Sequence, residues 1–267
     1  MMDRVRTGIP GFDELIEGGF PKTSNVLLTG LPGTGKTIFA LEYLYNGAMN
    51  GENGIYVTLD ESFEMIKEQA MQFGWDFDKL EAENKIAFIS IRLGRTKLDI
   101  FDQIRDVRDR IDAKRLVFDN LATFSVNLDL FTIPVGYAGS IASTVEMTAK
   151  GIESGGNLLA DKGDKIYYTG DMEKRLIYLI VEHMSRLGTT NLVLTYGNPD
   201  VNQLTIDGVS EFACDGIVEL YNQLIGAKHV RTITVLKMRN TNQNQYINDL
   251  EIGKNGLVVK PVEKVYG

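Results

Sequence analysis

The sequence predicts an α/β fold with a mainly parallel central sheet flanked by helices and with antiparallel strands at its C-terminal edge. Segments typical of strands alternate with amphipathic helices through much of the chain. A glycine-rich loop, Gly30 to Thr37, joins the first strand of this series to its helix. Helical periodicity stops near residue 217, and short strands then follow one another. Alternating strands and helices build parallel sheets, whereas consecutive strands pair antiparallel.

Hydrophobic runs and spacings define the elements of the first half. Short apolar runs predict strands at residues 25–29, 54–59, 85–90 and 116–119. Apolar residues three and four positions apart predict a helix that starts near residue 35, one at 63–73 and one at 100–111.

The second half begins with a break in this pattern, because Ser125 to Gly170 is rich in Gly, Ser and Thr and has no clear period. A helix from Leu176 to Leu187, closed by Gly188, and a strand from Asn191 to Thr195 follow. Antiparallel strands are expected at 217–221, 229–238, 246–252 and 257–259.

The composition is that of a soluble globular protein, with 43% hydrophobic and 24% charged residues. We expect a single domain over residues 1–267 that carries an insertion at about 125–171. Neither a secretory signal nor a membrane-spanning run is visible, so a cytoplasmic location is expected. The net charge of −8 argues against a general affinity for nucleic acid. The lone Cys214 excludes an internal disulfide.

The phosphate-binding motif is Gly30-Leu-Pro-Gly-Thr-Gly-Lys-Thr37, which matches G-x-x-x-x-G-K-[ST] at every fixed position. Its glycines let backbone N–H groups turn toward phosphate oxygens at a helix N-terminus. We expect ATP or ADP here, with Lys36 at the β and γ phosphates and Thr37 on Mg²⁺. A dinucleotide-binding motif is excluded, because Ile38 stands where its third glycine belongs. The expected nucleotide contacts in the loop are Gly33, Thr34, Gly35, Lys36, Thr37 and Ile38.

Acidic and hydroxyl side chains at strand ends are the remaining candidates. Asp119 ends an apolar strand and suits the Mg²⁺ shell, although a cap or turn would explain it too. Asp60 or Glu61 could orient the attacking water, and Asp60 could instead cap the next helix. Thr195 could sense the γ-phosphate or be an ordinary strand-end threonine.

These pieces together resemble the KaiC-like ATPases of the RecA/RadA superfamily of P-loop NTPases. The likeness covers residues 3–124 and 172–260. It rests on motifs in the family's order: Thr7-Gly-Ile-Pro-Gly-Phe-Asp13, Gly18-Gly-Phe-Pro21, the phosphate loop, Tyr56-Val-Thr-Leu-Asp-Glu61, Phe73-Gly-Trp-Asp76 and Lys237-Met-Arg239.

The resemblance implies self-association into a homohexameric ring with ATP between neighbouring subunits. In such rings a K-x-R pair reaches the next subunit's γ-phosphate, and here it would be Lys237 and Arg239, with Thr241 as a further nucleotide contact. From the residues alone, this pair also fits a solvated strand surface. A cation supplied in trans stabilises charge in the transition state.

Departures from the family pattern refine this expectation. The family has two adjacent glutamates where Asp60 and Glu61 stand, and the shorter Asp60 suggests slow hydrolysis. Glu211 and Phe212 occupy the positions of the clock protein's phosphorylated Ser-Thr pair, so no such autophosphorylation is expected. The histidine that ends the family's K-x-R-G-T-S-H stretch is replaced by Gln243.

The insertion at 125–171 is longer than this connection usually is in the family and would face the ring's opening. From Ser125 to Glu173 there are three lysines, no arginine and seven acidic residues, which would repel phosphates. A loop or a docking surface for a protein partner therefore fits better than DNA binding.

The resulting hypothesis is an ATPase that hydrolyses ATP slowly at ring interfaces, with a regulatory or signalling role. One alternative is a nucleotide-gated scaffold with little hydrolysis, and another is a DNA-dependent, recombinase-like ATPase.

Overall fold

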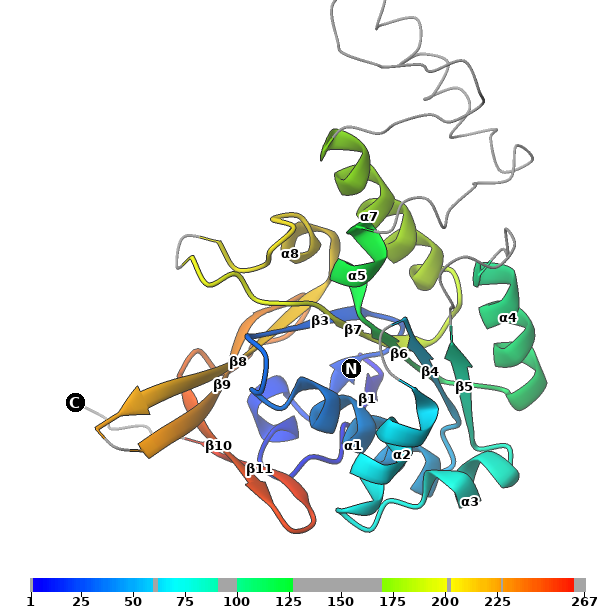
Figure 1. The fold of residues 1–267 in the computed structure, drawn as a ribbon, viewed down its shortest axis with the longest axis horizontal. Helices are drawn as coiled ribbons and strands as arrows, with labels where there is room; N and C mark the ends of the chain where they lie inside the picture. The colour runs from blue at the N-terminus through cyan, green and yellow to red at the C-terminus, as the bar shows by residue number, and fades with distance from the viewer. Residues whose placement is uncertain are drawn as a thin grey trace, which may run out of the picture.

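The computed structural model describes residues 2–59, 62–90, 100–126, 170–200, 203–226 and 228–261. Within these ranges, nine strands form one large sheet (Figure 1). In order across the sheet they are β11 (Gly256–Lys260), β10 (Asn248–Gly253), β9 (Lys228–Met238), β8 (Gly216–Ile225), β3 (Asn25–Thr29), β7 (Thr190–Leu194), β6 (Arg115–Asp119), β4 (Gly54–Thr58) and β5 (Ile86–Ser90).

The strands from β8 to β5 run parallel, and those from β8 to β11 pair antiparallel. Every residue of β3, β4 and β7 is buried, as expected for strands covered on both faces. The predicted fold class is therefore confirmed. One detail differs: β8, expected in the antiparallel group, is parallel to β3 and antiparallel only to β9. The long connection from β7, which includes the short helix α8 (Ser210–Ala213), allows this crossover.

Two layers of helices cover the sheet (Figure 1). One apolar core packs beneath the first layer and a second core beneath the other. The first layer contains α1 (Lys36–Met49), α2 (Phe63–Met71) and α3 (Phe77–Ala82). The second contains α4 (Ile100–Ile111), α5 (Leu121–Val126) and α7 (Gly170–Ser185).

The N-terminal segment holds α1 in place. It contains β1 (Arg4–Val5), the 3-10 helix η1 (Asp13–Ile16) and β2 (Phe20–Pro21). Asp13 accepts hydrogen bonds from the backbone of Thr7 and Gly8 at 2.9 and 3.0 Å, and Asn46 of α1 donates to the Thr7 carbonyl at 3.1 Å. The Thr7–Asp13 motif is therefore a turn closed by hydrogen bonds, and it contacts α1, the helix that follows the phosphate loop.

Local signals located most elements well. The strand predicted at 25–29 has these bounds in the structure, and Gly188, with φ of 72°, follows α7 as a left-handed residue. The short elements β1, β2, η1, α3, α5 and α8 were not predicted, because they span two to six residues and offer too little periodicity. None of the described helices has the length and apolar composition needed to cross a bilayer.

Candidate nucleotide site

The Gly30–Thr37 loop connects β3 to α1 and depends on glycine at three positions. Gly30, Gly33 and Gly35 have φ values of 148°, 80° and 110°, which side chains disfavour. At Gly30 a Cβ atom would lie 2.2 Å from the Leu220 carbonyl oxygen of β8. No side chain caps the N-terminus of α1. The first turn of this 14-residue helix therefore presents N–H groups and a partial positive charge to an anion.

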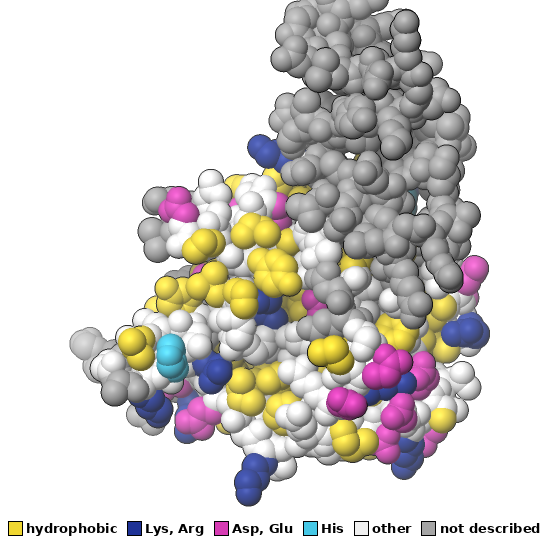
Figure 2. All heavy atoms as spheres, in the orientation of Figure 1, with side chains coloured by type: hydrophobic (Ala, Val, Ile, Leu, Met, Phe, Trp, Pro, Cys, Tyr) yellow, Lys and Arg dark blue, Asp and Glu magenta, His cyan; other side chains and the backbone are white. Residues whose placement is uncertain are grey.

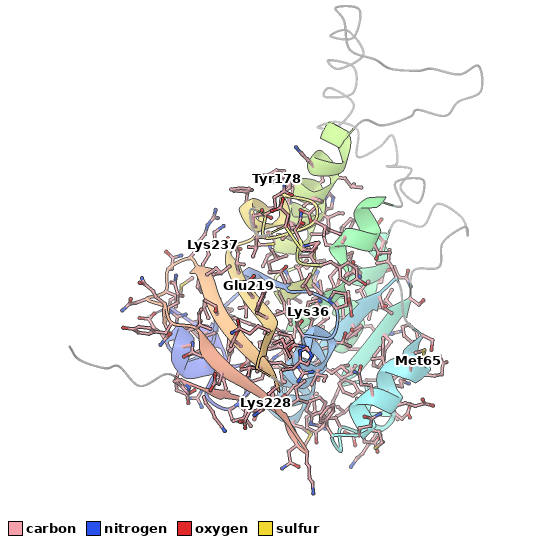
Figure 3. All side chains as sticks on the ribbon, turned by 60° about the vertical axis from the view of Figure 1, so that its left-hand side comes forward. Lys36, Met65, Tyr178, Glu219, Lys228 and Lys237 are labelled. Atoms are coloured by element: carbon pink, nitrogen blue, oxygen red, sulfur yellow. The ribbon has the colours of Figure 1, made fainter. Side chains whose placement is uncertain are left out.

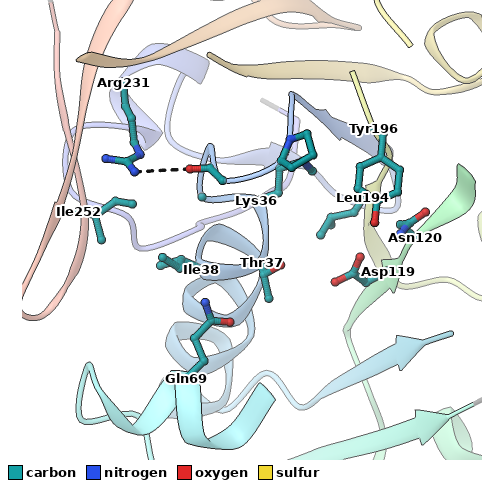
Figure 4. Close-up of a pocket in the computed structure, with 13 residues that line it drawn as sticks. Lys36, Thr37, Ile38, Gln69, Asp119, Asn120, Leu194, Tyr196, Arg231 and Ile252 are labelled. Carbon is teal, nitrogen blue, oxygen red and sulfur yellow. Dashed lines mark hydrogen bonds between the residues drawn. The ribbon is translucent and has the colours of Figure 1, made fainter. Parts of the chain in front are cut away.

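A cavity of about 390 Å³ opens in front of the loop (Figure 4), a volume within the range of small-molecule sites. It extends along the sheet edge from β6 to β9 and β10. The lining residues are Pro32, Gly33, Gly35, Lys36, Thr37, Ile38, Gln69, Asp119, Asn120, Leu194, Tyr196, Arg231 and Ile252.

Lys36 is folded back into the loop. Its Nζ donates to the carbonyl oxygens of Gly30 and Leu31 at 2.6 and 3.1 Å, and lies 5.3 Å from the Tyr196 ring centroid. Burial lowers the pKa of Lys36 to about 8, against the opposing effect of the Asp119 carboxylate. A phosphate in the cavity would replace two carbonyl dipoles with a full negative charge, so the amine is suited to an anionic ligand.

Asp119 ends β6 and faces the cavity together with Thr37. The hydroxyl of Tyr56, from β4, donates to Asp119 Oδ2 at 2.5 Å. A carboxylate and a hydroxyl are the oxygen ligands that Mg²⁺ takes beside phosphate and water, so these residues fit that ion. Tyr56 was not predicted as a site residue, although its strand precedes Asp60 and Glu61.

The remaining loop residues divide between lining and support. Gly33, Gly35 and Ile38 line the cavity, whereas Thr34 is buried and donates its hydroxyl to the Leu31 carbonyl at 2.9 Å. Thr195 does not line the cavity, and its hydroxyl faces Asp207 at 3.4 Å.

Lys237, Arg239 and Thr241 lie away from the cavity of their own chain. Lys237 pairs with Ile217, which is level with Leu27 in the middle of the sheet. Figure 3 shows Lys237 on β9, apart from Lys36. In this subunit the three side chains contact their own fold: Lys237 donates to the Glu211 and Cys214 carbonyls, Arg239 pairs with Asp215, and Thr241 accepts from Arg4.

Two predicted parts of the site lie outside the described residues. These are the candidate water-orienting residues Asp60 and Glu61, and most of the insertion, residues 127–169.

Arg231 and Ile252 are cavity residues that sequence reasoning missed. Arg231 lies on β9, and its Nη2 is 3.5 Å from the Gly33 carbonyl oxygen. Ile252, on β10, lies 3.5 Å from the position of a Cβ on Gly35. Alternation in β9 places Arg231 on the face of Ile233 and Val235, but only the strand order brings that face to the loop.

Sequence comparisons with known proteins give matches over most of the chain. A model of the KaiC ATPase family matches residues 5–130 and 156–264. A UPF0273 protein of Thermotoga maritima is 30% identical over 280 residues, which cover 98% of each chain. The circadian clock oscillator protein KaiC of Prochlorococcus marinus is 28% identical over 259 residues, or 97% of this chain and 45% of that protein.

A solved structure is similar over nearly the whole chain. The crystal structure of a KaiC-like protein from the hyperthermophilic archaeon Pyrococcus horikoshii superposes with a TM-score of 0.75 and is 31% identical. The match covers 98% of this chain and 100% of the other.

Proposed function

The chain belongs to the KaiC family of ATPases and is an ATP-binding ATPase of the RecA fold, and from this premise we propose that it hydrolyses ATP slowly at the subunit interfaces of a ring. The observation that carries the proposal is the Gly30–Thr37 loop, which opens on a cavity with Asp119 and Thr37 on one side. We assign the ring a regulatory or signalling role, with a protein partner docking on the insertion at 125–171.

The residues of one subunit account for nucleotide and metal binding. Lys36 leaves the Gly30 and Leu31 carbonyls and neutralises the β and γ phosphates. Thr37 and Asp119 would hold Mg²⁺, and the hydrogen bond from the Tyr56 hydroxyl would fix the orientation of the Asp119 carboxylate. The bound Mg²⁺ supplies charge neutralisation to the transferred phosphoryl group. Glu61 or Asp60 orients the attacking water, and the short reach of Asp60 makes this step slow.

A second subunit completes the site. Among the described lining residues the cations are Lys36 and Arg231, and Arg231 lies at the opposite end of the cavity from Asp119. The γ-phosphate end therefore has room for a further cation. Lys237 and Arg239, which do not serve their own cavity, supply it to the neighbour, and Thr241 adds a contact there.

The surface near Lys237 suits a subunit interface. Leu236, the residue before Lys237, is 44% exposed. Phe212, the residue after Glu211, whose carbonyl accepts a hydrogen bond from Lys237, is 66% exposed. Figure 2 shows that hydrophobic side chains are exposed on the face of the molecule turned toward the viewer. Exposed apolar surface of this kind favours association.

The first test is ATP turnover per chain with Mg²⁺ over a wide range of protein concentration, with Lys36→Ala as the blank. A rate that rises with concentration and then levels off is expected, because each site needs a neighbour. A rate equal to that of Lys36→Ala at every protein concentration would contradict hydrolysis and favour the alternative function, a nucleotide-gated scaffold.

A mixing experiment tests the contribution in trans. Lys36→Ala and Arg239→Ala should each be inactive alone, since one lacks the loop cation and the other the neighbour's cation. Mixed rings contain interfaces that join an intact loop to an intact Arg239, so activity should return. Mixed assemblies, verified by native mass spectrometry, that stay inactive would show that Arg239 does not act on the neighbour.

A further inference from the structure

The turn that follows β9 carries Arg239, the cation assigned to the neighbour's nucleotide. The Arg239 side chain is 60% exposed while it pairs with Asp215 at 3.1 Å, so its guanidinium can reach a second subunit. The backbone then bends at Asn240, whose φ of 55° is left-handed. This conformation is unfavourable for a residue with a side chain, so the turn depends on outside contacts to keep its shape.

Arg4 of β1 supplies contacts of this kind. Its Nη1 donates to the Thr241 hydroxyl at 3.0 Å, and its Nη2 donates to the Asn240 carbonyl oxygen at 3.2 Å. The Thr241 hydroxyl in turn donates to the Arg239 carbonyl oxygen at 3.2 Å. One guanidinium therefore holds both residues that follow Arg239, and through Thr241 it is connected to the backbone of Arg239 itself.

The N-terminal segment fixes Arg4 in its turn. Nη1 also donates to the Gly19 carbonyl oxygen at 3.2 Å, and Nη2 to the Glu17 carboxylate at 2.6 Å. The backbone of Arg4 pairs with Pro21 of β2, and only 14% of the Arg4 side chain is exposed. Each terminal nitrogen thus bonds one acceptor in its own segment and one in the turn after β9. The planar fork of an arginine can do this, whereas the single ammonium of a lysine cannot.

Backbone contacts anchor the two sides of the same turn. The Arg239 N–H donates to the Asp215 carbonyl at 3.0 Å, and the Asn244 N–H donates to the Leu15 carbonyl of η1 at 2.8 Å. Residues 239–247, between β9 and β10, form neither helix nor strand. Their path therefore depends on such contacts, and those of Arg4 lie immediately beside Arg239.

We propose that Arg4 is a positioning residue, which fixes the turn after β9 so that Arg239 projects toward the neighbouring subunit's nucleotide. This inference rests on the proposed function, because it takes Arg239 as the cation supplied in trans. Arg4 does not line the cavity of its own chain, so Arg4→Ala should leave Mg·ADP affinity unchanged. Turnover at saturating Mg·ATP should fall by about tenfold to a hundredfold, because a misplaced catalytic group costs rate on this scale.

Mixing variants shows which side of the interface Arg4 serves. Arg4→Ala and Lys36→Ala should regain turnover when mixed, because some interfaces then join an intact loop to a well-placed Arg239. Arg4→Ala and Arg239→Ala should stay inactive together, because neither supplies the cation in trans. Native mass spectrometry verifies that both mixtures contain mixed assemblies. Arg186→Ala is the matched control: it removes an exposed arginine that pairs with Glu182, and turnover should be unchanged.

Other outcomes overturn the inference. Rescue of Arg4→Ala by Arg239→Ala, and not by Lys36→Ala, would show that Arg4 serves the nucleotide loop of its own chain. The same result in both mixtures, or wild-type turnover of Arg4→Ala alone, would show that Arg4 does not position Arg239.

A second variant covers a folding defect, which thermal unfolding without nucleotide would detect. Arg4→Lys keeps the charge facing Glu17 but not the fork, so it should give the same pattern in the two mixtures, and wild-type turnover of this variant would contradict the inference. The proposed function is tested separately, because it fails if Lys36→Ala and Arg239→Ala stay inactive when mixed, whatever Arg4→Ala does.

Discussion

At the scale of single residues, Lys36 connects nucleotide binding to proton uptake. Burial lowers its pKa to about 8, so above that pH the free protein holds a largely neutral amine. Bound phosphates favour the charged form and raise the pKa again. Mg·ADP binding at pH 8.5 should therefore take up a fraction of a proton, and binding at pH 6.5 should take up less. Calorimetry in buffers of different ionisation enthalpy measures the difference, and equal uptake at both pH values would contradict it.

The Tyr56–Asp119 hydrogen bond is a second feature at this scale. Tyr56→Phe leaves the carboxylate without this donor, and a hydrogen bond to a charged group contributes about 1.5–3 kcal/mol. The affinity for nucleotide should fall about tenfold or more in the presence of Mg²⁺ and change little in EDTA, since the loop itself is untouched.

The control for Tyr56→Phe is the same substitution at a tyrosine whose hydroxyl lies outside the cavity. Tyr221→Phe removes such a hydroxyl from an exposed position on β8. Equal effects of Tyr56→Phe with and without Mg²⁺ would show that Tyr56 supports the fold rather than the metal ligand.

At the scale of elements, the loop and β8 fit together through Gly30. Gly30→Ala would bring a Cβ to 2.2 Å from the Leu220 carbonyl, whereas a Cβ at Gly33 meets nothing within 4 Å. Gly33→Ala should therefore destabilise by about 1 kcal/mol through its positive φ alone, and Gly30→Ala by several times more. Thermal unfolding without nucleotide measures both, and equal losses would contradict the steric explanation.

The contact between α1 and the β10–β11 hairpin depends on pH through Glu42. Its carboxylate is buried, accepts the Leu257 N–H at 2.7 Å, and has its pKa raised to about 7, chiefly by burial. A raised pKa means that the folded state binds the proton more tightly than the unfolded state, so stability is lost as pH rises from about 4.5 through 7.

Glu42→Gln keeps the acceptor and removes the charge. The variant should be more stable than the wild type by about 2 kcal/mol at pH 8 and differ little at pH 4. Urea denaturation at the two pH values measures this. A variant less stable at pH 8 would show that the charged hydrogen bond outweighs the cost of burial.

At the scale of the whole molecule, assembly should depend on the apolar surface beside Lys237. Phe212→Ser removes a 66% exposed aromatic side chain there and should weaken self-association and lower turnover at a given concentration, with nucleotide binding per chain retained. Leu224→Ser, at a 64% exposed position near the end of β8, is the control that should still assemble. Sedimentation velocity with Mg·ATP compares them, and unchanged assembly of Phe212→Ser would place the interface elsewhere.

The sequence predicted the parallel sheet and the phosphate loop because their signals are local. The buried strand, the glycine-rich loop Gly30–Thr37 and the helix after it lie within one short stretch. Continuous apolar runs mark the parallel strands, and an apolar period of 3.6 marks the longer helices. Short elements such as α3 were not predicted, because a helix of six residues shows little apolar periodicity. The signal that could have located α3 is its N-terminal cap, in which the Asp76 carboxylate accepts the Lys79 N–H at 2.9 Å.

By itself the sequence determined the fold class and the family, and it predicted the phosphate loop that opens on the cavity. Only the tertiary structure decided which distant residues line that cavity, because sheet order and register are set by packing of the whole chain. Crossover of the chain from β7 to β8 places β8 beside β3, and pairing of β9 and β10 then carries Arg231 and Ile252 to the loop. The same register keeps Lys237 level with Leu27, away from its own cavity, so a residue's distance along the chain did not predict its distance from the phosphate loop.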